Sequence, residues 1–166
     1  GDRGDRRRSS PDGVVRMIEV LCPTPDDTRA AGRRLAAALR PGDVVELAGG
    51  LGAGKTLFTG GLCEGLGVEE MVVSPSFVLV RQYGSGFMPV VHVDVYRLGS
   101  LHEFEDLDVF ELAADGVLVI EWGDAVESAL PEDHLRIEFV VSQDESRLLR
   151  LIPSGDWVER TLETVT

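Results

Sequence analysis

The segment Gly49–Thr56 constrains the fold of this chain more than any other. It matches the G-x-x-x-x-G-K-[ST] pattern of a phosphate-binding loop (P-loop). It follows the apolar run Val44–Ala48, which is typical of a buried strand, and it opens a helical pattern over Gly54–Leu66 that Gly67 should end. In such a context the backbone N–H groups of the loop and the positive end of the helix dipole face the same anion. The alternative is a glycine-rich turn with an incidental Lys-Thr pair.

Lys55 is the only lysine among the 16 basic residues, and all the others are arginines. A compact ammonium on a flexible stem can fold over a glycine loop and neutralise phosphate, whereas a guanidinium suits forked recognition of carboxylates. A coding bias against lysine explains the excess of arginine but not the position of the exception. We therefore expect Lys55 to bind phosphate and Thr56 to offer its hydroxyl to Mg²⁺.

Size and composition indicate one globular domain. The chain has 166 residues, of which 43% are hydrophobic and 27% are charged. Residues 1–13 lack apolar periodicity and should form a disordered tail, which leaves residues 14–166 as a single P-loop domain. The apolar runs are too short for a membrane span, and the start of the chain has no signal-peptide pattern.

The net charge of −13 argues against strong direct binding to nucleic acid, which depends on clustered cations. The cysteines, Cys22 and Cys63, are far apart in the sequence and form no C-x-x-C pair. Reduced, buried thiols in a cytosolic protein are the expected state.

Hydrophobic periodicity predicts an α/β fold, a P-loop NTPase-like three-layer domain with a mixed parallel and antiparallel sheet. The run Phe77–Tyr83 and the run Pro89–Tyr96 are joined by a short glycine turn and should therefore pair antiparallel. The expected strands are 14–21, 44–48, 71–73, 77–83, 89–96, 117–120, 135–141 and 148–152, and the expected helices are 25–39, 54–66 and 102–112.

Two carboxylates stand where apolar strands stop, Asp94 after Val90–Val93 and Glu121 after Val117–Ile120. Ligands of open α/β sheets collect outside the carboxyl ends of the strands, where a carboxylate can hold Mg²⁺ or orient the attacking water. His92 shares a strand face with Asp94, and a core or supporting histidine is favoured there over a catalytic one. The loop Ser74–Ser76 offers two hydroxyls that could order around a γ-phosphate, or it is an ordinary strand connection.

Four sequence blocks together resemble the bacterial ATPase family of tRNA threonylcarbamoyladenosine biosynthesis, the TsaE family. The resemblance covers nearly the whole chain after the tail and rests on Gly49–Thr56, on Ser74–Phe77 with Leu79, Val80 and Tyr83 following, on His92–Leu98, and on Glu121 with Trp122. It implies a cytoplasmic ATPase that uses ATP and Mg²⁺. It also implies two partner proteins that transfer threonylcarbamoyl to tRNA, so that tRNA is reached only indirectly.

The resemblance also implies roles for individual residues. Lys55 would bind the β- and γ-phosphates, Thr56 and Glu121 would hold Mg²⁺, and Asp94 would act in hydrolysis. The nucleotide would further contact the loop and two distant residues, namely Gly49, Gly52, Ala53, Gly54, Leu57, Thr28 and Arg147.

The chain departs from the family pattern at three positions. Gly50 stands where aspartate is usual, Leu57 where a second threonine is usual, and Ser76 where threonine is usual. A hydroxyl at position 57 could touch the α-phosphate, so Leu57 should weaken nucleotide binding by one hydrogen bond, about 1 kcal/mol.

Two other functions compete with an ATPase. A small P-loop kinase would need arginines gathered on a lid, and the middle of the chain has only Arg81 and Arg97. A nucleotide-dependent assembly factor with negligible catalysis of its own would share every feature described so far. A GTPase is disfavoured because its Asn-Lys-x-Asp motif needs a second lysine.

Overall fold

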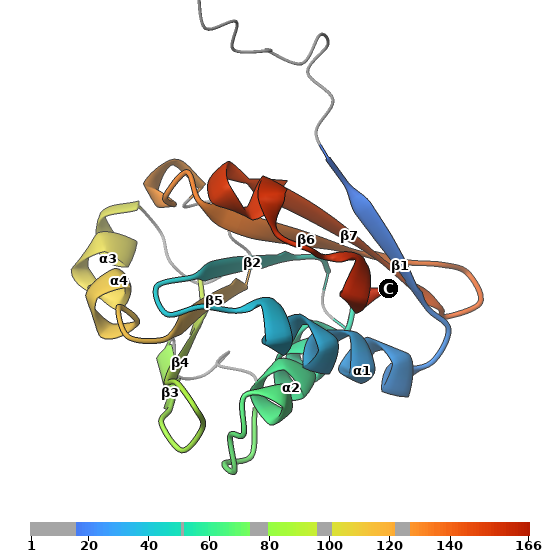
Figure 1. Ribbon diagram of the computed structural model, residues 1–166, viewed down its shortest axis with the longest axis horizontal. Helices are drawn as coiled ribbons and strands as arrows, with labels where there is room; N and C mark the ends of the chain where they lie inside the picture. Colours follow the sequence, from blue (N-terminus) through green and yellow to red (C-terminus); the bar gives the residue numbers. More distant parts are fainter. Residues whose placement is uncertain (1–15, 51, 74–79, 96–100, 122–126) are drawn as a thin grey trace, which may run out of the picture.

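The computed structural model describes residues 16–50, 52–73, 80–95, 101–121 and 127–166 as a seven-stranded mixed sheet with helices on both faces (Figure 1). The strand order is β1-β7-β6-β2-β5-β4-β3. The strands are β1 Ile18–Cys22, β2 Val44–Ala48, β3 Val80–Tyr83, β4 Val90–Asp94, β5 Val117–Glu121, β6 His134–Val141 and β7 Arg147–Ser154. The α-helices are α1 Pro25–Leu35, α2 Lys55–Gly65, α3 Leu101–Asp106 and α4 Val109–Leu112, and short 3₁₀ helices span Ala36–Ala38, Gly155–Glu159 and Glu163–Val165.

The sheet combines a parallel centre with antiparallel edges, as the sequence predicted. Strand β2 lies between β5 and β6 and is parallel to both, and β4 is parallel to β5. Strand β3 pairs antiparallel with β4, and β7 pairs antiparallel with both β6 and β1. The parallel centre brings the carboxyl ends of β2, β5 and β4 to one edge, where the P-loop follows β2.

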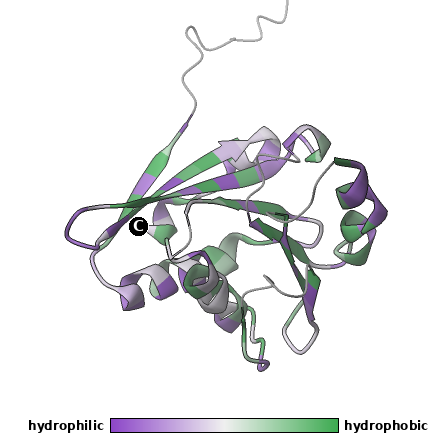
Figure 2. Ribbon diagram, turned by 180° about the vertical axis from the view of Figure 1, so that it is seen from behind, coloured by the Kyte–Doolittle hydropathy of each residue, from purple (hydrophilic) through white to green (hydrophobic). Residues whose placement is uncertain are grey.

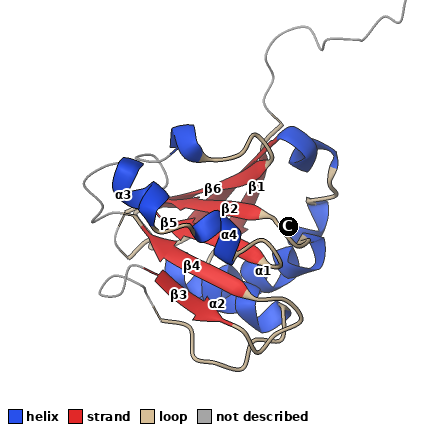
Figure 3. Cartoon of the chain, turned by 90° about the vertical axis from the view of Figure 1, so that its left-hand side faces the viewer, coloured by secondary structure: helices blue, strands red, loops and turns tan. Residues whose placement is uncertain are grey.

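Different helices cover the two faces of the sheet. In the side view of Figure 3, α4 lies in front of the sheet, and α1 and α2 lie behind it. The larger core lies on the α1–α2 side and includes Phe58 and Leu62, and the smaller one gathers Phe104 and Val109 against the opposite face. Every residue of β2, β4 and β5 is buried, which agrees with the hydrophobic middle of the sheet in Figure 2.

Close packing of α1 on α2 fixes the helix that follows the P-loop. A Cβ on Gly61 would lie 1.9 Å from the carbonyl oxygen of Arg29, and one on Gly32 would lie 2.1 Å from that of Phe58. The two backbones therefore approach too closely for any side chain at these positions. Both glycines thus help to set the position of α2 against the sheet.

Local signals at helix ends agree with the structure. Thr24 caps α1 in a capping box with Asp27, and Pro25 occupies the first helical position. Gly67, with φ of +80°, follows the end of α2 as expected.

Several predicted elements differ from the structure, and the strand expected over 14–21 is β1 Ile18–Cys22. The first α-helix ends at Leu35 rather than Leu39 and continues only as the 3₁₀ turn Ala36–Ala38. The helix expected over 102–112 is two short helices, because Asp108 adopts a left-handed conformation (φ +53°) between them. Residues 71–73 form no strand, and β3 is described only from Val80 onward.

The tail 1–13 and the loop Ser74–Ser76 lie outside the described residues, so the predictions for them stay predictions. Within the described ranges, none of the helices has both the length and the apolar character of a membrane span.

Candidate functional site

The segment after β2 has the conformation that a phosphate-binding loop requires. Gly52 and Gly54 adopt positive φ angles of 75° and 103°, which favour glycine. The amide of Ala53 donates to the carbonyl of Gly50 at 3.1 Å, and the amide of Phe58 donates to that of Gly54 at 2.9 Å, the first bond of α2. Gly54 is the N-cap residue and has no side chain with which to cap the helix. The N–H groups of the first turn are therefore left for another acceptor, such as an anion.

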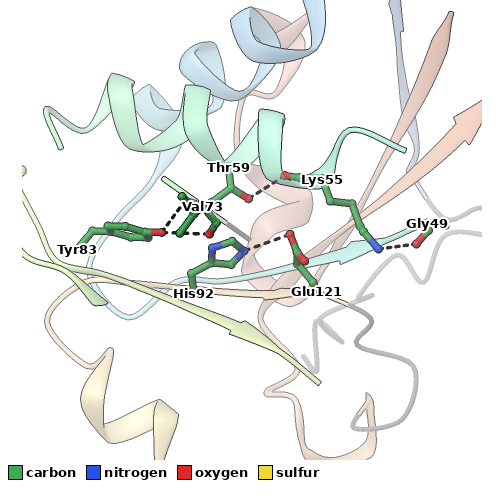
Figure 4. A network of polar contacts seen from close by, with 7 residues as sticks. All are labelled: Gly49, Lys55, Thr59, Val73, Tyr83, His92 and Glu121. Carbon is green, nitrogen blue, oxygen red and sulfur yellow. Dashed lines mark hydrogen bonds and ion pairs between the residues drawn. The ribbon is translucent and has the colours of Figure 1, made fainter. Parts of the chain in front are cut away.

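The ammonium of Lys55 is folded back over this loop (Figure 4). Its Nζ donates to the carbonyl oxygen of Gly49 at 2.6 Å, and the side chain is buried. Burial lowers the pKa of Lys55, while the nearby carboxylates of Glu121 and Asp94 act to raise it. The ammonium and both acids predicted from the sequence thus share one site.

Adjacent parallel strands place the two acids side by side. Asp94 is the last residue of β4 and Glu121 is the last residue of β5, and the two are direct partners in the register. They therefore face the same side of the sheet, at its carboxyl edge. Both are almost fully buried, with 5% and 3% of their surface exposed. Two buried carboxylates beside a phosphate-binding loop form a setting that suits a divalent cation.

His92 lies two residues before Asp94 in β4 and contacts Glu121. Its Nε2 lies 3.2 Å from Oε1 of Glu121, and no part of the side chain is exposed. The structure therefore agrees with a supporting histidine, which was the interpretation favoured from the sequence.

Thr28 and Arg147 both lie against the loop. The methyl group of Thr28 is 3.4 Å from the position that a Cβ on Gly54 would occupy. Arg147, at the start of β7, donates from Nε to the carbonyl of Ala53 and from Nη2 to that of Gly52, both at 3.1 Å. The structure thus brings both residues to the P-loop, where Arg147 binds loop carbonyls.

A groove of about 660 Å³ lies along α2, and both Thr56 and Leu57 line it. The segment 68–72 and Cys63 also line this groove. Burial raises the pKa of Cys63 to about 12, which makes this thiol inert at neutral pH. The cysteine is thus a packing residue, as expected, and Thr56 borders open space beside the first turn of the helix.

The oxygen donors at the site suit Mg²⁺. The described part of the chain contains no cluster of three or more histidine, cysteine, aspartate or glutamate side chains able to hold a metal. Mg²⁺ typically takes only one or two protein carboxylates and completes its shell with phosphate and water. The carboxylates of Glu121 and Asp94 fit that pattern, whereas Thr56, the second residue of α2, lines the groove along the helix.

Tyr83 makes a contact that was not predicted from the sequence. Its hydroxyl lies 3.2 Å from the amide and 3.3 Å from the carbonyl of Val73, the last described residue before Ser74 (Figure 4). The tyrosine formed part of the sequence resemblance but received no role. Its position in the resemblance was the only signal that could have marked it, because the contact joins two separate segments.

Comparison with known proteins identifies the family. The family model described as "Threonylcarbamoyl adenosine biosynthesis protein TsaE" matches residues 22–149. The chain is 38% identical over 153 residues to the tRNA threonylcarbamoyladenosine biosynthesis protein TsaE of Bacillus subtilis (strain 168), covering 92% of this chain and 96% of the relative. It is 54% identical over 113 residues to the protein of the same name from Streptomyces coelicolor, covering 66% and 76%.

A solved structure has a similar fold. The crystal structure of Bacillus subtilus YdiB aligns with a TM-score of 0.73 and 33% identity, covering 87% of this chain and 90% of that one. The sequence match, the P-loop and the mixed sheet agree: this chain belongs to the TsaE family.

Proposed function

We propose that this protein binds Mg-ATP at the P-loop and hydrolyses it, in the cytoplasm, in support of the protein complex that makes threonylcarbamoyladenosine in tRNA. The observation that carries the proposal is the convergence of Lys55, Asp94 and Glu121 beside a glycine loop at the start of α2. Membership of the TsaE family and the names of the relatives support the link to this tRNA modification.

The residues divide the work between binding and chemistry. The N–H groups of the first turn of α2 would hold the phosphates, and Lys55 would turn from the Gly49 carbonyl to neutralise the β- and γ-phosphates. Thr56 and Glu121 would hold Mg²⁺, which screens the charge of the transferred phosphoryl group. Asp94, beside Glu121 in the register, would then orient the attacking water.

The loop itself needs support to keep this conformation. Its shape comes from the backbone of four residues, namely Gly49, Gly52, Ala53 and Gly54. Arg147 holds it from β7 through two hydrogen bonds, and Thr28 of α1 lies next to Gly54, so in this proposal they act on the loop conformation as well as near the nucleotide. Leu57 offers no hydroxyl, so we expect the intrinsic affinity for nucleotide to be modest.

The acidic charge of −13 favours action through partners. We propose that the protein works with a two-protein threonylcarbamoyl-transfer complex and reaches tRNA only through it. Hydrolysis by the protein alone is then expected to be weak, because the partners complete the site, as supplied arginine fingers do in other P-loop proteins.

The test is the rate of ATP hydrolysis by the protein alone and with the partner pair. Strong stimulation by the partners, abolished by Glu121→Ala, supports the proposal. Nucleotide binding without hydrolysis in either condition would indicate an assembly factor instead. Brisk turnover that the partners leave unchanged would contradict the proposal and point to an independent enzyme.

A further inference from the structure

We infer that His92 is a positioning residue for Glu121: its Nε2–H holds one carboxylate oxygen and so directs the other to the Mg²⁺ of the bound nucleotide. The inference deepens the proposed function and rests on it. It gives a physical reason for the His-x-Asp spacing in β4.

The strand register explains how one histidine can reach a glutamate on the next strand. His92 and Asp94 are two residues apart in β4 and therefore face the same side of the sheet. Asp94 pairs with Glu121, and His92 pairs with Val119, so the imidazole stands one step behind the carboxylate. Asp94 therefore lies beside Glu121. His92 lies diagonally behind Glu121, further from the edge where the nucleotide would bind.

Burial makes this contact specific. The His92 side chain is completely buried, and 4% of the Glu121 side chain is exposed, so bulk water cannot replace the imidazole as a hydrogen-bond donor. A carboxylate oxygen accepts hydrogen bonds, so Nε2 must carry the hydrogen at its separation of 3.2 Å from Oε1. Among the described residues Nδ1 has no hydrogen-bond partner, which is tolerable for an unprotonated ring nitrogen.

Residues behind metal ligands commonly act in this way. Hydrogen bonds from such residues fix the rotamer of the ligand, and their loss typically weakens metal binding by roughly 10–100-fold. Lys55 lies near the same carboxylate, so without a fixed rotamer Glu121 could turn toward the ammonium instead of the metal. His92 would thus hold Glu121 ready before the nucleotide arrives.

The experiment compares ATP binding with Mg²⁺ and with EDTA, by titration calorimetry. His92→Leu removes the donor at similar volume, whereas His92→Gln keeps an N–H donor. We expect His92→Leu to lose roughly 10–100-fold in apparent Mg²⁺ affinity while its ATP binding in EDTA stays unchanged. His92→Gln should recover most of the loss.

Val90→Ala is the matched control. Val90 lies on the same face of β4, two residues before His92, and is equally buried. This variant should lower stability without changing the Mg²⁺ dependence. An equal loss of Mg²⁺ affinity in Val90→Ala and His92→Leu, or wild-type Mg²⁺ dependence in His92→Leu, would overturn the inference while leaving the proposed function intact. Absence of ATP binding in the wild type would overturn both.

A measurement on the unmodified protein remains decisive if His92→Leu does not fold. The chain has three histidines, so the imidazole signals in ¹⁵N NMR can be assigned with His102→Gln and His134→Gln, which both leave His92 in place. We expect the Nε2–H tautomer at His92 in the free protein, and a larger shift change with Mg-ATP than with ATP in EDTA. An Nδ1–H tautomer would overturn the inference.

Discussion

Two buried glutamates lie on neighbouring strands of the sheet but differ in their surroundings. Glu46 of β2 is 0% exposed and Glu121 of β5 is 3% exposed. In the register Glu46 pairs with Ile120 and Leu47 pairs with Glu121, so the two carboxylates point to opposite faces of the sheet. Burial alone would rank them equally as functional candidates.

The two glutamates differ in the side chains that they contact. Glu46 forms an ion pair with Arg136, and Nε2 of His134 lies 3.8 Å from its second oxygen. Oε1 of Glu121 instead lies 3.2 Å from Nε2 of a buried histidine, and Glu121 lies with Asp94 near the ammonium of Lys55, at the end of its strand. A buried acid paired with an arginine within the sheet is structural, whereas the two acids at the strand ends beside the P-loop are the candidates for the functional site. The partners of a buried acid therefore identify the site better than burial does.

Replacement of Glu121 is the strongest test of this contrast. Glu121→Ala should lower the rate of Mg²⁺-dependent ATP hydrolysis by roughly 100-fold or more, because the metal loses a ligand, while much of the nucleotide binding remains. A steady-state phosphate-release assay in the presence of the partner pair measures the loss. Normal turnover in this variant would remove Glu121 from the mechanism.

Replacement of Arg136, the ion-pair partner of Glu46, should lower the stability of the fold and leave ATP hydrolysis unchanged. Arg136→Ala removes the arginine from a buried carboxylate, and we expect a loss of about 3 kcal/mol in the free energy of unfolding, measured by urea denaturation. Hydrolysis per folded molecule should stay unchanged. The double variant Glu46→Leu, Arg136→Leu should recover most of the stability, and a specific loss of hydrolysis in it would show that Glu46 is functional.

The burial of Lys55 beside Glu121 and Asp94 predicts that ATP binding depends on pH. Burial lowers the pKa of Lys55 below its usual 10.5 in the free protein. Only the ammonium neutralises phosphate, so ATP affinity should fall by up to about tenfold per pH unit as the pH rises through that lowered pKa. Titration calorimetry at a series of pH values measures the fall, and affinity that stays constant up to 10.5 would contradict the lowered pKa.

The free energy of unfolding should rise with pH, whereas the affinity for ATP should fall. Between the lowered pKa and 10.5 the unfolded chain holds a proton that the folded chain has released, so the free energy of unfolding without nucleotide rises with pH. Denaturation across this window checks the sign, and Lys55→Met should abolish the rise. If the free energy of unfolding of the wild type instead falls as the pH rises, and Lys55→Met removes that fall, then the pKa of Lys55 is raised. The two carboxylates would then affect this pKa more than burial does.

The smallest expected effect concerns the tyrosine of β3. Tyr83→Phe removes the hydroxyl that bonds the backbone of Val73 and should lower the free energy of unfolding by about 1 kcal/mol. Thermal denaturation measures this loss. Tyr83→Leu is the comparison variant, because it also removes the buried ring and should lose clearly more stability. Equal stability of Tyr83→Phe and the wild type would show that the bonds to Val73 contribute nothing measurable.

Much of the local structure could be predicted from the sequence. The cap at Thr24, the stop at Gly67 and the loop between β2 and α2 depend on neighbours within a few residues, and all three were confirmed. The predictions that failed concern the extent of elements. The first helix ended early at Leu35, and Asp108 interrupted the helix expected over 102–112, because packing and single backbone conformations outweigh average propensity.

The candidate site was predictable only in part. The place of Lys55 in the motif and of Asp94 and Glu121 after apolar runs is legible in the sequence, so all three were candidates on that ground alone. The bonds of Tyr83 to Val73 and the ion pair of Glu46 with Arg136 carry no local signal, because their partners lie 10 and 90 residues apart in the chain.

The glycine loop, the strand before it and the helix after it could be predicted from the sequence, because each depends on short-range backbone preferences and on the pattern of apolar residues. Three contacts could be seen only in the folded chain: Asp94 lies beside Glu121, His92 lies behind Glu121, and Arg147 binds the loop carbonyls. The first two depend on strand register, because a shift of one residue between β4 and β5 would turn these side chains to opposite faces, and the packing of the whole sheet sets the register.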